Sequence, residues 1–258
     1  MKVPKIKFMP MSLEENIEVI KWAYYHKDDS LDVHWYTIQY FPELAQIDPM
    51  ASREENYQQI ARVVTKDYET YREKIQEEVK RYDRLWSIYN DEYFEMLSNY
   101  LKVEWPHHIN VIEVKVGLIP VFPRYLDDFS FSLSTNLEES KCVNVCAHET
   151  LHFLWFEKWK KLHPETPRRE YDSPYITWKY SEMVTDPILN NKPFSELFKL
   201  RERGYDSFYE VRDGDNFAMD ILRSIYGENI PIEEKINKGF LYITNVLDSD
   251  KKDKKHSK

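Results

Sequence analysis

The sequence predicts a predominantly helical α+β protein that contains a small sheet. The stretch from Met50 to Trp105 has no glycine and no proline, and its apolar residues recur at steps of three and four, as on one face of a helix. Two shorter stretches, Ile112–Leu118 and Phe129–Leu133, alternate between apolar and polar residues, as half-buried strands do. Glycine is scarce, with 5 in 258 residues, which favours long helices over glycine-rich phosphate-binding loops.

Start and stop signals divide the first hundred residues into helices. The expected helices cover about 13–26, 31–40 and 50–105. Two capping boxes mark their starts: Ser12 with Glu15, and Ser52 with Glu55. A single rod over the apolar seam from Tyr57 to Tyr100 would be about 66 Å long at 1.5 Å per residue, which exceeds a compact domain. We therefore expect a break near Asp83 or at Asn90-Asp91.

The second half of the chain is also expected to be mostly helical. Thr135 and Glu138 have the spacing of a capping box, which predicts a helix from there to about Lys161. Ser173 and Pro174 are the residue types of an N-cap and a first helical position, so the next helix should begin there and end at about Pro187. Further helices are expected at about 195–203, 215–226 and 232–247.

Composition limits the class of protein. The formal net charge is −9, and the last eleven residues carry five lysines against three aspartates, so the rest of the chain is more acidic still. This acidity argues against general binding of nucleic acid. No stretch approaches eighteen apolar residues, and Met1–Lys7 is not followed by an apolar run, so neither a membrane span nor a secretory signal is expected. Cys142 and Cys146 are expected to be reduced and buried, which fits a cytoplasmic protein.

The segment Cys146–His152 carries the clearest chemical pattern. His148 and His152 are four residues apart, so on a helix their rings stand one turn apart and can bind one Zn²⁺. Glu149 follows the first histidine and can accept a proton from a zinc-bound water. The alternative is an amphipathic helix with two incidental histidines. Apolar residues surround the motif on many sides, however, and burial of these polar groups is costly unless they are paired or bind metal.

A catalytic zinc usually has three protein ligands and an open position for water, so a third ligand must come from elsewhere in the chain. The position six residues after His152 is Lys158, which excludes a third histidine there. His163 lies past the expected end of the helix, and Glu157 lies on the wrong side of the helix from His152. The best candidate is Glu182, which lies on the following helix.

At these residues the chain resembles the gluzincins, the thermolysin-like branch of the zinc metallopeptidases. Their second helix carries the pattern N-E-x-x-x-D, and Ser181–Asp186 looks like it, with Ser in place of Asn. The resemblance implies that Glu182 is the third metal ligand and that Asp186 is the second-shell carboxylate that holds the ring of His148. It also implies a zincin-like core, with a small sheet beside the motif helix and an edge strand, here Phe129–Ser134, that binds the substrate backbone.

The resemblance spans roughly 109–190 and departs from the family in two respects. The gap between His152 and Glu182 is longer than in thermolysin. The family also uses a downstream histidine or tyrosine to stabilise the oxyanion, and the only histidine after Glu182 is His256. Tyr205 and Tyr209 are the candidates for this role, although the sequence favours a structural aromatic residue at each position.

The sequence thus predicts three regions and one leading function. The regions are a helical N-terminal region at 1–105, a zincin-like metallopeptidase core with C-terminal helices at 106–247, and a disordered basic tail at 248–258. The expected function is zinc-dependent hydrolysis of peptide bonds in a peptide or protein substrate, with Glu149 as general base. The alternative is a catalytically silent interaction or regulatory protein with the zincin fold and a structural zinc.

Overall fold

The computed structural model describes residues 2–26, 32–48, 50–199 and 201–256, with side chains through Asp248. It confirms the α+β class, since the described chain is mostly helical with a small mixed sheet. The contacts divide the chain into two compact units. The sheet unit comprises Lys2–Asp91 with Pro106–Cys146, and the helical unit comprises Glu92–Trp105 with the chain from Ala147 onward. The helices α4 (Asn90–Leu101) and α5 (Glu139–Leu162) each run continuously from one unit into the other.

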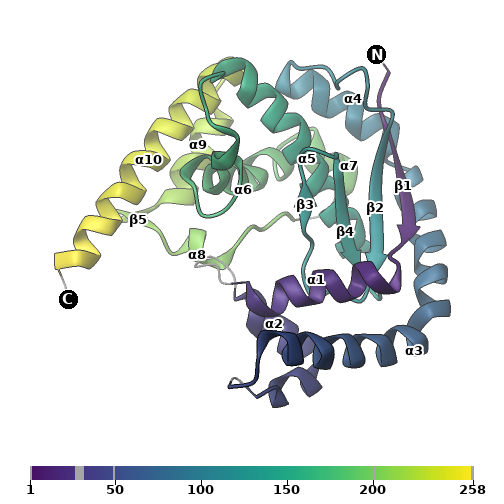
Figure 1. Cartoon of the computed structure of the whole chain (residues 1–258). Helices are drawn as coiled ribbons and strands as arrows, with labels where there is room; N and C mark the ends of the chain where they lie inside the picture. Colours follow the sequence, from purple (N-terminus) through teal and green to yellow (C-terminus); the bar gives the residue numbers. More distant parts are fainter. Residues whose placement is uncertain (1, 27–31, 49, 200, 257–258) are drawn as a thin grey trace. The chain divides into compact units, whose positions relative to one another are not determined.

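The sheet has the strand order β1-β2-β4-β3, as Figure 1 shows. The strands are β1 (Lys5–Pro10), β2 (Val111–Gly117), β3 (Arg124–Tyr125) and β4 (Ser130–Ser134). The first three in this order are parallel, and β3 is antiparallel to β4. β2 and β4 confirm the two strands expected from the alternation of apolar residues. β1 was not expected, and it joins the supposedly helical region 1–105 to the chain that follows it.

β4 is not the free edge strand that the family resemblance implied. It pairs with β2 on one side and with β3 on the other. Beyond the short β3 ladder, the backbone N–H of Ser132 donates to the carbonyl oxygen of Pro123 at 3.0 Å. The Ser132 donor on this side of β4 is thus already used by the neighbouring segment. An added substrate strand would have to displace this segment.

Helix α1 (Leu13–Tyr25) runs across the carboxyl ends of β1 and β2 in Figure 1. The fully buried Asn16 connects α1 to the residue after β2. Its side-chain oxygen accepts from Leu118 N at 2.7 Å, and its side-chain nitrogen donates to Ser12 O at 2.7 Å. The approach is close at Gly117, where an added Cβ would lie 2.7 Å from Asn16 Oδ1 and 2.8 Å from Met11 Sδ. A larger residue at this position would therefore force at least one of these side chains to move.

The long apolar-periodic stretch divides into α3 (Arg53–Ser87) and α4. The break falls at Ile88-Tyr89, next to the expected position at Asn90. The Asn90 side chain stabilises this corner, since its oxygen accepts from Ile6 N at 3.1 Å and its amide nitrogen donates to Pro4 O at 3.0 Å.

The capping boxes expected at Ser12 and Ser52 are both present. The smaller elements of this region are α2 (Val33–Tyr40) and the 3-10 turn η1 (Pro42–Gln46); Leu31, expected to begin a helix, lies outside the described residues.

Tyr82 on α3 fixes the turn that leads from β4 into α5. Its buried hydroxyl donates to Ser134 O at 3.0 Å and accepts from Leu137 N at 2.9 Å. The expected cap of α5 at Thr135 is wrong, because the helix begins at Glu139 and Cys142 N donates to Glu138 O. Residues 135–138, which were expected to begin the helix, instead form the turn that is hydrogen-bonded to Tyr82.

The helical unit contains the remaining elements. They are the 3-10 turn η2 (Arg168–Tyr171), α6 (Ile176–Leu189), α7 (Phe194–Phe198), α8 (Asp206–Tyr209), the short hairpin of β5 (Arg212–Asp213) and β6 (Asn216–Phe217), α9 (Ala218–Gly227) and α10 (Ile232–His256). Four expected boundaries are wrong. The N-cap of α6 is Tyr175 rather than Ser173, and α6 continues through Pro187. α7 ends at Phe198 rather than at about 203, and α10 extends to His256 where a disordered tail was expected.

Stacked aromatic rings form much of the core of the helical unit. Trp155 and Trp159 on α5 stack with ring centroids 5.1 Å apart. Tyr180 on α6 packs edge-on against Trp155, and its hydroxyl donates to Ile236 O at 2.9 Å. This packing joins α5, α6 and α10, so the two helices that carry the candidate metal ligands rest on a rigid base.

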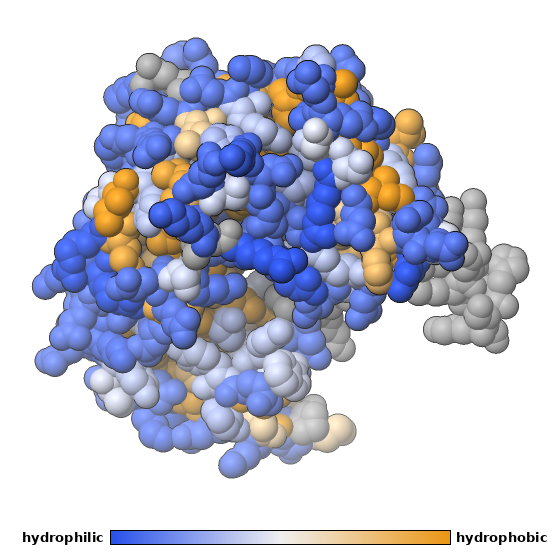
Figure 2. Space-filling model, turned by 180° about the vertical axis from the view of Figure 1, so that it is seen from behind, coloured by the Kyte–Doolittle hydropathy of each residue, from blue (hydrophilic) through white to orange (hydrophobic). Residues whose placement is uncertain are grey.

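The surface and the cysteines agree with the composition. The face in Figure 2 is mostly hydrophilic, with hydrophobic side chains in separate patches. None of the helices in the described ranges is both long and apolar enough to cross a membrane. Cys142 and Cys146 are buried and are not joined in a disulfide, as expected.

Candidate metal centre

Helix α5 brings the two histidines of the motif together as the spacing predicts. The Nε2 atoms of His148 and His152 lie 3.1 Å apart, and the ring centroids are 4.7 Å apart. The side chain of His152 is fully buried, whereas that of His148 is 17% exposed. The apolar neighbours on α5 are buried as well, including Leu151, Phe153 and Leu154. His148 is thus the more exposed side chain of the pair.

Glu182 completes the group from α6. Its Oε2 lies 3.2 Å from Nε2 of His148, and its Oε1 lies 3.4 Å from Nε2 of His152. Ser181, directly before Glu182, is fully buried, and its hydroxyl donates to Trp178 O one turn earlier on α6 at 2.7 Å. His148, His152 and Glu182 thus form a group whose ligand atoms all lie within 4.8 Å of one another.

The separations fit a small tetrahedral transition-metal ion. With metal–ligand distances of 2.0–2.1 Å, tetrahedral geometry puts donor atoms roughly 3.3 Å apart. Nε2 of His148 lies 3.1 Å from Nε2 of His152 and 3.2 Å from Oε2 of Glu182, and Nε2 of His152 lies 3.4 Å from the other Glu182 oxygen, Oε1. Imidazole is a ligand for Zn²⁺ and related ions, whereas Ca²⁺ and Mg²⁺ prefer oxygen. The donor set therefore fits the zinc ion that the sequence predicts and disfavours calcium and magnesium.

A second carboxylate, Glu202, lies on the other side of the His148 ring. Its Oε1 is 2.8 Å from Nδ1 of His148, and its side chain is 2% exposed. Asn190, the C-cap of α6, holds the backbone of Glu202 in place. Its amide donates to Glu202 O at 2.9 Å, and its side-chain oxygen accepts from Glu202 N at 2.8 Å.

The charges around His148 favour its protonated form in the metal-free protein. Burial by itself lowers the pKa of this imidazole, but the negative charge of Glu202 and the hydrogen bonds to Glu182 and Glu202 raise it well above its ordinary value. The charge of Glu149 acts in the same direction. A metal ion that binds Nε2 must therefore displace a proton there.

Asp186 does not hold His148, contrary to the role that the resemblance implied. Its carboxylate accepts from Nε and Nη2 of Arg223, both at 2.8 Å, and from the hydroxyl of Tyr209 at 2.7 Å. Asp186 thus connects α6 to α8 and α9. The hydrogen bond that was expected of Asp186 is made by Glu202 instead.

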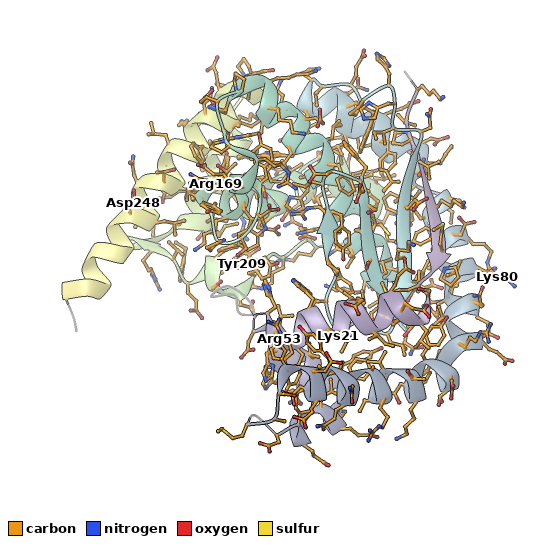
Figure 3. All side chains as sticks on the ribbon, viewed as in Figure 1. Lys21, Arg53, Lys80, Arg169, Tyr209 and Asp248 are labelled. Carbon is orange, nitrogen blue, oxygen red and sulfur yellow. The ribbon has the colours of Figure 1, made fainter. Side chains whose placement is uncertain are left out.

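The described contacts of Tyr205 and Tyr209 do not include the candidate metal ligands. The hydroxyl of Tyr209, labelled in Figure 3, is engaged by Asp186 and also accepts from Gly204 N at 3.1 Å. The ring of Tyr205 packs against Trp178 and Phe208, with centroids 5.8 and 5.5 Å away. A catalytic role for either tyrosine stays a prediction.

The other side chains weighed for the metal lie elsewhere. His163 contacts Asn237 through Nε2 at 2.9 Å, and its ring packs against Trp159. Glu157 accepts from Lys160 at 2.7 Å on the surface of α5. Glu149, the candidate base, is 6% exposed and follows His148 directly.

Comparison with protein-family models, with curated proteins and with solved structures finds no match to this chain. The chemistry of the centre must therefore be inferred from its own residues and their geometry.

Proposed function

We propose that this protein is a zinc-dependent peptidase. The observation that carries the proposal is the convergence of Nε2 of His148, Nε2 of His152 and the carboxylate of Glu182 from two helices. Glu149, directly after the first of these residues, supplies the base that metal-assisted hydrolysis needs.

The number of converging side chains supports a catalytic rather than a structural metal. Structural zinc sites usually have four protein ligands, whereas catalytic sites have three and keep one position open. Among the described residues, the group contains three side chains, and one of them, His148, is partly exposed. Two neutral imidazoles and one carboxylate leave a net positive charge on a divalent ion, which favours the polarisation of a carbonyl group.

The residues of the chain have distinct tasks in the proposed reaction. Bound zinc supplies Lewis acidity to the scissile carbonyl and to the attacking water. Glu149 accepts the proton of that water and later donates it to the leaving amine. Glu182 and the two histidines hold the metal on helices whose packing limits their movement.

The test compares the wild type with Glu149→Gln. Zinc content is measured by elemental analysis, and hydrolysis is measured with a fluorescently labelled unfolded protein and with a random-sequence peptide pool. We expect the variant to keep its zinc and to lose hydrolysis by a factor of about 10²–10⁴, which is typical for removal of a general base. Glu157→Gln, on the same helix but paired with Lys160, is the matched control and should retain both properties. Equal cleavage by Glu149→Gln and the wild type would contradict the assignment.

The alternative is a silent scaffold that binds zinc and performs no hydrolysis. It predicts stoichiometric zinc in the wild type and no cleavage of either substrate. A wild type without a stoichiometric metal ion would overturn both readings. A location in the cytoplasm and the absence of nucleic-acid partners stay predictions from the sequence.

A further inference from the structure

We propose that Glu202 is a positioning residue that fixes the ring of His148, so that Nε2 and not Nδ1 faces the metal, and that Asn190 holds Glu202 in place. The inference rests on the metal-binding part of the proposed function and does not depend on the reaction that follows.

The first step concerns the two nitrogens of His148. Nε2 lies among the converging ligand atoms, and Nδ1 lies 2.8 Å from Oε1 of Glu202. An ionised carboxylate can only accept a hydrogen bond, so Nδ1 must carry the hydrogen. In a neutral imidazole the lone pair is then on Nε2, where a metal can bind. Glu202 thereby selects the tautomer that the site requires.

The second step concerns the placement of Glu202 itself. The Asn190 side chain makes two hydrogen bonds to the backbone of Glu202, one to its C=O and one from its N–H. A neighbouring β-strand would make the same pair of bonds. Asn190 caps the helix that also carries Glu182. One helix therefore determines the positions of both carboxylates that flank the His148 ring.

A third contact lies between the backbone of Glu182 and the carboxylate of Glu202. The hydroxyl of Thr185 donates to the backbone oxygen of Glu182 at 2.8 Å and lies 3.4 Å from Oε1 of Glu202. Thr185 is fully buried, and Glu202 is nearly so. A buried carboxylate is retained at a cost unless it is paired, and Nδ1 of His148 lies 2.8 Å from Oε1 of Glu202.

The assignment also accounts for Asp186. In this chain the residue at the family's position for holding the histidine is bound by Arg223 and Tyr209. Glu202 reaches Nδ1 of His148 from a different segment and makes the same type of hydrogen bond.

The test measures zinc affinity by competition with a chelator of known affinity. Glu202→Met keeps the length of the side chain but removes the acceptor, and we expect it to weaken zinc binding by about 10–100-fold. Glu202→Gln keeps an acceptor without the charge and should fall between Glu202→Met and the wild type. Glu196→Gln, an exposed glutamate that pairs with Lys192, is the control and should bind zinc as the wild type does.

A second readout separates positioning from a purely structural role. Nitrogen-15 NMR of the zinc-loaded protein should show His148 protonated at Nδ1 in the wild type, and this signal should be lost or exchange-broadened in Glu202→Met. Asn190→Ala keeps the carboxylate but frees its backbone. It should weaken zinc binding by a smaller factor, and it provides the test if Glu202→Met does not fold.

The possible failures are distinguishable. Wild-type zinc affinity in Glu202→Met and Asn190→Ala would overturn the role of Glu202 and leave the peptidase proposal standing. Zinc binding that depends on Glu202 in a protein that cleaves nothing would support the role of Glu202 and overturn the peptidase proposal. A wild type that binds no zinc would overturn both.

Discussion

Arg223 and Asp186 form a two-point ion pair in the helical unit. Nε and Nη2 of Arg223 lie 2.8 Å from Oδ1 and Oδ2 of Asp186, respectively, and the hydroxyl of Tyr209 adds a third hydrogen bond at 2.7 Å. Asp186 is 2% exposed and Arg223 is 35% exposed. The pair connects α9 to the helix that carries Glu182, so its main contribution should be to the stability of the fold.

Asp186→Ala should therefore destabilise the protein without a direct effect on the metal. Removal of the carboxylate leaves two donors of Arg223 and one of Tyr209 without their acceptor, and we expect a loss of about 2 kcal/mol in the free energy of unfolding. Urea unfolding of the metal-free protein measures this loss. Zinc affinity should change by less than about threefold, since carboxylates that orient a ligand typically contribute 10–100-fold. A large loss of zinc affinity with unchanged stability would restore the role that the gluzincin resemblance implied.

The same pair predicts a dependence of stability on pH. Burial by itself raises the pKa of Asp186, but the hydrogen bonds and charge of Arg223 and the Tyr209 hydroxyl bring it below the ordinary value of 3.8. A carboxyl group whose pKa is depressed on folding stabilises the protein above its unfolded-state pKa, and this contribution is lost as the pH falls through the folded-state pKa.

The measurement is the difference in unfolding free energy between the wild type and Asp186→Asn. This difference should be largest at about pH 6 and smaller at about pH 3. Near pH 3 the Asp186 carboxyl binds a proton more readily in the unfolded wild type than in the folded protein, which favours unfolding. Asp220→Asn removes the exposed partner of Arg223 and is the control. Its difference from the wild type should be small, as for most exposed ion pairs. A difference for Asp186→Asn that grows toward low pH would contradict the depressed pKa.

Tyr209→Phe distinguishes a structural tyrosine from an oxyanion partner. The hydroxyl donates to the buried Asp186 carboxylate, so its removal should lower the free energy of unfolding by about 2 kcal/mol. We expect kcat to change by less than about tenfold, whereas loss of an oxyanion donor typically lowers kcat by about 10²–10³. Tyr175→Phe alters an exposed tyrosine and should affect neither quantity. A fall in kcat of a hundredfold at unchanged stability would assign Tyr209 to catalysis.

The parts of the centre that the sequence predicts are those that local geometry determines. His148 and His152 meet because residues four apart on a helix lie one turn apart, whatever the rest of the chain does. Glu182 was found through its spacing from Asp186, and the structure brings it to the histidines. The same spacing gave Asp186 the wrong partner, because the choice between His148 and Arg223 depends on where α9 packs.

Glu202 and β1 could not be predicted, since both depend on distant contacts. Glu202 follows a short helix in a charged segment, and its burial depends on the hydrogen bonds from Asn190. In β1 the alternation of Lys5, Ile6, Lys7 and Phe8 is brief, and its partner β2 lies about a hundred residues later in the chain. Patterns this short carry little weight without knowledge of the partner strand.

Gly117→Ala tests the close approach of α1 to β2 in the sheet unit. The added methyl group would lie 2.7 Å from Asn16 Oδ1 and 2.8 Å from Met11 Sδ, so at least one of these side chains must move. We expect a loss of about 1–3 kcal/mol, the usual range for overpacking a buried site. Gly227→Ala is the control, because a Cβ there meets no atom within 4 Å. Thermal and urea unfolding measure both variants, and equal stability of Gly117→Ala and the wild type would contradict the packing.

Removal of the metal should destabilise the helical unit through mass action. A ligand that binds only the folded state at 100 times its dissociation constant adds about 2.7 kcal/mol to the unfolding free energy, and a chelator should remove this contribution. Hydrogen exchange should locate the effect, with greater protection on zinc addition for amides of α6 than for those of β2. His152→Ala, which removes a fully buried ligand, should abolish the zinc-dependent shift, whereas His163→Ala should retain it because His163 contacts Asn237 instead. If zinc-loaded and chelated wild type unfold alike, the group formed by His148, His152 and Glu182 does not bind zinc at the concentration used.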